Sequence, residues 1–155
     1  MTPLQQVLVA KAAFAEPASI LRGIPLELAT VRPHGLPHSL YEELWHIDYW
    51  LRFSWALVRG EYPAIPAHSS GAWPADNDSL DEVSWQTLLE RVREGLGTLA
   101  TLAQDETELA RAFLPDRTVE VELTVVAAHN AYHFGRMVTL RQLLGIWSAE
   151  LGNTG

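Results

Sequence analysis

Cysteine is absent from the 155 residues of the chain. Disulfide bonds, thiolate metal ligands, zinc-finger patterns and a cysteine nucleophile are therefore excluded. Positive charge is also scarce, because the formal net charge is -8 and Lys and Arg form no cluster or basic face. Nucleic acids and acidic membrane surfaces normally require a positive electrostatic footprint, so both are disfavoured as partners.

Long apolar runs are missing as well. The N-terminal stretch "MTPLQQVLVAKAAF" lacks the apolar core of a signal peptide, and no run approaches the ~18 residues of a membrane span. The chain also lacks a Gly-rich phosphate loop and a nucleophile-elbow pattern. We therefore expect a soluble, cytoplasmic protein, a location that the lack of cysteine also fits.

Helical signals dominate what is present. Apolar residues make up 48% of the chain, enough for one core, so we expect a single domain over residues 1–155. The capping-box pattern "SLYE" predicts a helix over 39–59, and a second one, "SLDE" at 79–82, predicts the start of another long helix. Thr118 is the expected N-cap of a last helix over 119–144, which Gly145 ends.

The remaining segments complete a predicted bundle. An Ala- and Leu-rich helix is expected over residues 3–15, and a short one begins at Pro17. Residues 60–78 are rich in Pro, Gly, Ser and Asp, and at ~3.3 Å per residue they can run back along a helix ~30 Å long. No strand pattern is convincing. The sequence therefore predicts an all-α four-helix bundle with a long crossover between helices two and three and short extra helices near the N-terminus.

Two histidines lie four positions apart in "AAHNAYHFGRM", within the last predicted helix. The expected inward stripe of this helix is Val121, Val125, His129, His133, Met137, Leu140 and Leu144. An i, i+4 spacing puts both imidazoles on one face, where they can reach a single ion. A buried imidazole needs partners for both ring nitrogens, so two separately hydrogen-bonded core histidines are an equally good interpretation of this motif alone.

A third histidine, His46, lies in the middle of the predicted 39–59 helix, in "EELWHIDYW". Taken alone it would be a hydrogen-bonded core residue, but its height in the bundle can match that of the 129/133 pair. Three protein ligands that leave coordination positions open are typical of catalytic metal sites. The other histidines, His34, His38 and His68, lie in predicted loops and are expected at the surface.

Four segments, "PHSLYEELWHIDYW", "AWP", "VSWQTLLERV" and "TVEVELTVVAAHNAYHFGRM", resemble the DinB-like superfamily, which includes the YfiT-type proteins and some thiol-dependent transferases and isomerases. The similarity spans about residues 17–147. It implies an up-down-down-up four-helix bundle, often a homodimer. It also implies a divalent metal held by one histidine of the second helix and an HxxxH pair of the fourth, which match His46, His129 and His133 here.

The neighbours of these histidines leave alternatives open. Arg136 stands where relatives often have Gln, and it would favour an anionic ligand near the metal or point to solvent. Tyr132, which fits the "HxxYHxG" pattern of the family, could hydrogen-bond substrate or pack in the core. Glu43 and Asp48 could accept hydrogen bonds from a ligand histidine or belong to a solvated helix face. Trp73 is the tryptophan expected to line an opening.

These features predict a metal-dependent enzyme, a thiol S-transferase or a hydrolase, acting on a small organic substrate. Metal-bound water or thiolate would react, aided by Tyr132 and Arg136, and a thiol would be a low-molecular-weight cosubstrate because the chain has no cysteine. Three imidazoles suit zinc, nickel, iron or copper, of which we expect zinc or nickel. The alternative is a non-catalytic metal- or small-ligand-binding protein with a structural triad. A DNA-associated protein is disfavoured by the charge.

Overall fold

The computed structural model describes residues 1–9, 15–75 and 80–148. Three long helices dominate it: α4 (Leu40–Val58), α5 (Glu82–Leu102) and α7 (Val119–Leu143). Shorter elements surround them: α1 (Pro3–Leu8), α2 (Pro17–Ile20), α3 (Leu26–Ala29), the 3-10 helix η1 (Ser69–Ala72) and α6 (Glu106–Ala110). The fold is therefore mostly helical, as the sequence predicts. None of the helices in the described ranges is long and apolar enough to cross a membrane.

A small hairpin is the exception to the predicted all-helical structure. Strands β1 (Ala112–Leu114) and β2 (Arg117–Thr118) pair antiparallel just before α7. Strands of three and two residues are too short to show the alternation of apolar and polar residues by which a strand is recognised in sequence.

The boundaries of α4 follow from its caps and confirm the prediction. Ser39 Oγ accepts a hydrogen bond from the Glu42 N–H at 3.3 Å, and the Glu42 carboxylate accepts one from the Ser39 N–H at 2.8 Å. This reciprocal pair satisfies two of the N–H groups that a helix start leaves unpaired. At the other end, Arg59 is the C-cap and Gly60 has a φ of 81°.

The start of α5 differs from the prediction. Asp81 is the N-cap, and its carboxylate accepts from the Ser84 N–H at 2.7 Å, so the helix begins at Glu82. Ser79 of the predicted capping box lies outside the described residues. An aspartate caps a helix as well as a serine does, so two candidate caps so close together could not be separated by pattern. The predicted 3–15 helix is seen as α1, and residues 10–14 of it also lie outside the described ranges.

The last helix has the predicted ends but a different inward face. Thr118 caps α7, and Gly145 ends it with a φ of 71°. However, Val121 and Val125 are 47% and 49% exposed, so their place in the predicted inward stripe is wrong. Apolar residues lie all around this helix, which contacts α4 on one side and α1 and α2 on another. Periodicity alone therefore could not identify its buried face.

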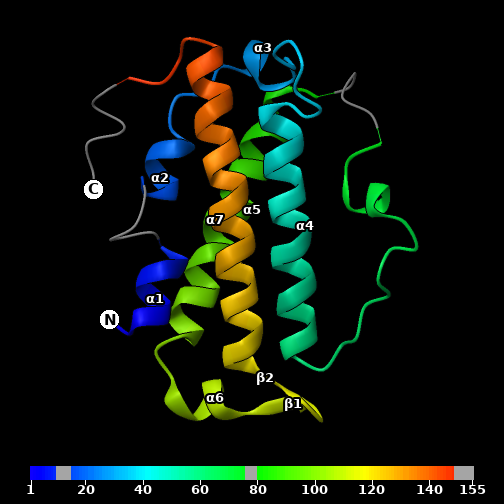
Figure 1. Cartoon of the computed structure of the whole chain (residues 1–155), viewed down its shortest axis with the longest axis vertical. Helices are drawn as coiled ribbons and strands as arrows, with labels where there is room; N and C mark the ends of the chain where they lie inside the picture. Colours follow the sequence, from blue (N-terminus) through cyan, green and yellow to red (C-terminus); the bar gives the residue numbers. More distant parts are fainter. Residues whose placement is uncertain (10–14, 76–79, 149–155) are drawn as a thin grey trace.

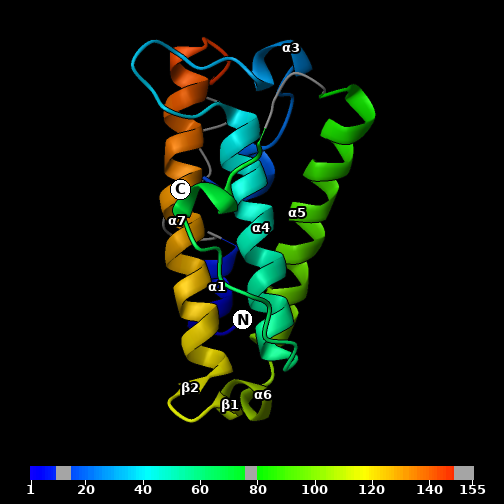
Figure 2. The same ribbon diagram turned by 90° about the vertical axis from the view of Figure 1, so that its right-hand side faces the viewer.

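The long helices lie side by side, with α4 packed against both α5 and α7. Figures 1 and 2 show α4 and α5 running in the same direction and α7 running in the opposite one. The crossover segment, as we name residues 60–75, passes back along α4 towards the start of α5 (Figure 2). The histidines of α4 and α7 therefore face each other across one helix–helix contact, beside the crossover segment.

Candidate metal site

Three histidines converge where α4 and α7 pack together. His46 comes from α4, and His129 and His133 come from successive turns of α7. Their ring centroids are 4.4 to 5.1 Å apart, and one nitrogen from each ring lies within 4.8 Å of the other two. His46 and His133 are buried and His129 is partly buried. The structure thus brings together the three residues that the sequence selected, in a group that could hold a metal ion.

The outer nitrogen of each imidazole has a hydrogen-bond acceptor beside it. His46 Nδ1 lies 2.7 Å from the Ala72 carbonyl oxygen, and His133 Nδ1 lies 2.6 Å from Glu43 Oε2. His129 Nδ1 lies 3.3 Å from Asn130 Oδ1. Since these oxygens only accept, each Nδ1 carries the hydrogen. Each Nε2 is then left with a lone pair, which is the form that ligates a metal.

The inner nitrogens fit a cation between them. His46 Nε2 and His129 Nε2 are 3.1 Å apart, and with both protons on Nδ1 neither can donate to the other. Two lone pairs at that distance repel unless a positive charge lies between them. A zinc ion with Zn–N bonds of ~2.0–2.1 Å would place two tetrahedral ligands about 3.3 Å apart. The donor set of three neutral imidazoles therefore fits a divalent metal.

Burial keeps two of these imidazoles, those of His46 and His129, neutral. The pKa of His46 is lowered to about 4, chiefly by desolvation and also by the nearby His133 and His129, while the hydrogen bond to the Ala72 carbonyl acts in the opposite direction. Desolvation, followed by the proximity of His133, also lowers the pKa of His129. At neutral pH both rings are thus in the unprotonated state that metal binding requires.

Glu43 holds the third histidine from the opposite helix. Its carboxylate is fully buried and accepts from His133 Nδ1 on one oxygen and from Arg136 Nε at 2.7 Å on the other. A carboxylate behind a ligating imidazole fixes the ring orientation and strengthens the nitrogen as a donor. The structure therefore supports the interpretation in which Glu43 accepts a hydrogen bond from a candidate ligand histidine, and not the one in which it belongs to a solvated helix face.

Asp48 fits neither of its two predicted roles. It is buried rather than solvated, and its carboxylate binds Arg52 at 3.0 Å and Arg91 at 2.9 Å. It therefore joins α4 to α5, on the side of α4 away from the histidines.

Arg136 and Tyr132 lie together beside the triad. Besides binding Glu43, Arg136 donates from Nη1 to the Tyr132 hydroxyl oxygen at 3.1 Å. The guanidinium thus faces Glu43 and Tyr132, so the interpretation that it simply points to solvent is wrong. Tyr132 is 60% exposed, which excludes core packing, and its ring meets that of His133 edge-on at 4.9 Å.

The crossover segment contributes contacts that the sequence did not predict. The Trp73 ring stacks on His46 with centroids 4.0 Å apart, and on His38 with centroids 3.6 Å apart. His38 is therefore partly buried rather than a surface residue. Both faces of the Trp73 ring are therefore covered by histidines, while the residue as a whole is only partly buried. His34 and His68 are exposed, as expected.

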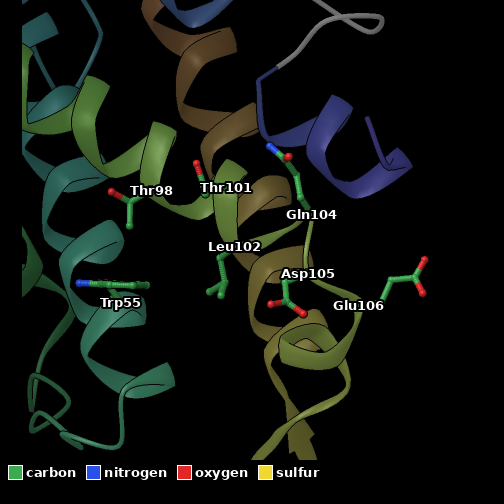
Figure 3. A pocket seen from close by; sticks show the side chains of 7 residues that line it. All are labelled: Trp55, Thr98, Thr101, Leu102, Gln104, Asp105 and Glu106. Atoms are coloured by element: carbon green, nitrogen blue, oxygen red, sulfur yellow. The ribbon is translucent and has the colours of Figure 1, made fainter.

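The pocket drawn in Figure 3 lies away from the three histidines. It has a volume of about 780 Å³ between α4, the end of α5 and the start of α6. Its lining residues are Trp55, Thr98, Thr101, Leu102, Gln104, Asp105 and Glu106. Both acidic side chains are exposed, and Asp105 is already used as the N-cap of α6. The lining thus offers no buried reactive group.

Comparison with known protein families supports the resemblance noted from the sequence. The chain matches the DinB superfamily over residues 12–137, a range that contains all three histidines. Neither the search of curated proteins nor the search of solved structures found a match. Since the matched range covers most of the chain, including all of α4 and most of α7, the protein belongs to the DinB superfamily.

Proposed function

We propose that this protein is a metal-dependent enzyme that holds one divalent metal ion on His46, His129 and His133. The observation that carries the proposal is the convergence of three imidazoles whose Nδ1 atoms each lie beside an acceptor oxygen, while one nitrogen from each ring lies within 4.8 Å of the other two. We further propose that the helices form the up-down-down-up bundle of the family. In that arrangement α1 and α2 together take the place of the first helix.

The charge balance around the triad suggests which ligands the metal would favour. Burial lowers the pKa of His46 and of His129, so these two imidazoles are neutral at neutral pH, and Arg136 offsets the charge of Glu43. A divalent metal bound there would polarise a water or thiol at an open position and lower its pKa. With no charge supplied by the protein ligands, an anionic donor is the natural occupant of that position. This supports a hydrolase or a thiol S-transferase that uses a small-molecule thiol.

Residues next to the triad are suited to holding a substrate. Tyr132 accepts from Arg136, so its own O–H remains to donate outward to a polar group. On the other side, the Trp50 ring lies 6.3 Å from both His46 and His129, and Phe53 lies 5.0 Å from Trp50. We propose that these aromatic rings exclude water and contact the apolar part of a small organic substrate, while Tyr132 orients its polar part.

Metal content tests the site. Protein purified without a metal-affinity step and dialysed against zinc or nickel should retain about one ion per chain, measured by elemental analysis. His129→Ala should lose it, and this variant should still fold because His129 is the least buried of the three. His34→Ala, an exposed histidine, serves as the matched control and should retain the metal. No retained metal in wild-type protein would sink the proposal.

Turnover separates the enzyme from the non-catalytic alternative. Metal-loaded wild-type protein should accelerate the reaction of a small electrophile with a low-molecular-weight thiol, or the hydrolysis of a small ester, over the rate of free metal in buffer. His46→Ala should abolish the acceleration. If metal is bound but no thiol or ester reacts faster than in buffer, the protein is a metal- or small-ligand-binding protein with a structural triad.

The expected homodimer stays a prediction, as does the cytoplasmic location. The exposed side of α7 favours self-association, because it carries Val121, Val125, Tyr132 and Leu143 with roughly half or more of each side chain accessible. We propose that two copies pair through this face. Light scattering should give twice the chain mass, and Val125→Glu should give a folded monomer. A monomeric wild type at high concentration would contradict the proposal.

A further inference from the structure

The crossover segment reaches the histidine cluster at one point, the end of η1. Ala72 is buried there, and its carbonyl accepts the hydrogen bond from His46 Nδ1 at 2.7 Å. A backbone carbonyl that contacts a candidate ligand must be held in place by the rest of its segment. What holds residues 69–75 against α4 therefore also decides where the His46 ring points.

The ring of Trp73 provides that attachment. It lies between His38 and His46, nearly parallel to both, with interplanar angles of 4° and 12°. His38 directly precedes Ser39, the N-cap of α4, and His46 lies two turns into that helix. The three stacked rings, which we name the His–Trp–His stack, therefore join the crossover segment to α4 itself and to the residue just before its N-cap.

This arrangement makes His46 different from the other two histidines. The partners of His129 and His133 come from the long helices themselves, Asn130 from α7 and Glu43 from α4. The Nδ1 edge and one face of His46 are instead held by Ala72 and Trp73 of the crossover segment. If that segment moves away, His46 loses both contacts, whereas the other two rings keep their hydrogen-bond partners and His133 loses only an edge contact with Trp73 at 6.0 Å.

We propose that Trp73 is a positioning residue of the metal site, and that metal binding and the docking of residues 69–75 on α4 stabilise each other. The inference rests on the proposed metal site at His46, His129 and His133. Linkage requires the effect to be reciprocal: a docked segment that raises metal affinity by a given factor is itself favoured by the same factor when metal binds. Trp73 acts through His46 and is not itself a ligand.

Zinc affinity, measured by competition with a chromogenic chelator, tests the first half of the proposal. Losing an outer partner of a metal ligand lowers affinity about 10–100-fold, and we expect Trp73→Ala to fall in that range. Trp73→Phe keeps an aromatic ring in the stack and should lose much less. Trp55→Ala is the matched control, because Trp55 is a partly buried tryptophan of α4 that lines the pocket of Figure 3 and should leave zinc affinity unchanged.

Hydrogen exchange tests the reciprocal half and does not depend on activity. Zinc should slow amide exchange in residues 69–75 of wild-type protein and have no such effect in His129→Ala. A second variant, His38→Ala, removes the outer ring of the stack while leaving Trp73 and all three histidines in place. His38→Ala should also lower zinc affinity. It therefore tests the stack even if Trp73→Ala fails to fold.

The outcomes separate this inference from the proposed function. If wild-type protein binds neither zinc nor nickel, both are overturned. If wild type, Trp73→Ala and His38→Ala bind zinc with equal affinity, the positioning role is overturned and the metal site stands. If Trp55→Ala loses as much affinity as Trp73→Ala, the loss reflects general damage to the fold, and the positioning role is again overturned.

Discussion

Two parts of the molecule hold the same three histidines by different means. On the helix side, His133 is fixed by a buried carboxylate that also binds Arg136, so charge-assisted hydrogen bonds set its position. On the crossover side, His46 is fixed by a backbone carbonyl and by ring stacking, without any charged group. The position of His133 therefore depends on the chemistry of single side chains of the helices, whereas the position of His46 depends on the path of the whole crossover segment.

The largest expected effect tests the helix side. Glu43→Ala removes the acceptor of His133 and leaves Arg136 without its buried partner, which should destabilise the fold by about 3 kcal/mol. This destabilisation is at the lower end of the range for a broken buried ion pair, because Arg136 keeps some access to water. Zinc affinity should also fall, by about 10–100-fold. Urea unfolding and chelator competition measure the two effects, and a variant that matches wild type in both would contradict the role of Glu43.

The next effect concerns pH and the crossover side. Burial lowers the folded-state pKa of His46 to about 4, whereas the unfolded chain has a pKa near ~6.5. Between these values the unfolded state binds more protons, so the stability of metal-free protein should fall as pH drops from about 6.5 to about 4. Above about 6.5 this contribution is fully present and constant. Thermal unfolding across that range should show a weaker pH dependence in His46→Gln, and an unchanged dependence would contradict the assignment.

A smaller effect, of opposite sign, separates Arg136 from Trp73. Arg136→Gln leaves the charge of Glu43 unbalanced beside His133, which should make a bound cation more favourable. We therefore expect zinc affinity to stay equal or rise a few-fold, whereas Trp73→Ala lowers it. The same chelator competition measures both. A tenfold loss in Arg136→Gln would mean that Arg136 supports the site in another way.

The smallest effect tests the register of α7, on which the placement of both of its histidines depends. Val125 is exposed in the single chain, so Val125→Ser should change the free energy of unfolding by less than about 0.5 kcal/mol at protein concentrations low enough to keep the chains monomeric. Val126 is buried one position later, and Val126→Ser should cost clearly more, since it places a hydroxyl in the core. If the two variants changed the free energy of urea unfolding equally, Val126 would not be the residue of this turn that faces the core.

The two sides also differ in how far the sequence could predict them. The i, i+4 spacing of His129 and His133 is local, and the capping box at Ser39 sets the frame of the helix that carries His46, so the sequence alone indicates these three histidines. The stacking of Trp73 between His38 and His46 joins residues far apart in sequence through a segment without periodicity. No pattern could have paired them, and the acceptor of His46 is a backbone carbonyl, which every residue has.

The inward face of α7 shows a third limit. Val121 and Val125 continue the spacing of the histidines, yet they are exposed, because this helix has apolar residues on several sides. The convergence of the three histidines is independent of this difference, because it depends on the spacing of His129 and His133 and not on the rest of the stripe.

X-ray absorption spectroscopy of the zinc-loaded protein tests the central claim most directly. A site formed by His46, His129 and His133 predicts three imidazole nitrogens at ~2.0–2.1 Å from zinc, with further light-atom ligands from solvent. His129→Ala should reduce the imidazole signal or lose the metal altogether. A zinc ion surrounded by oxygen ligands alone, or one whose spectrum is unchanged in His129→Ala, would contradict the account.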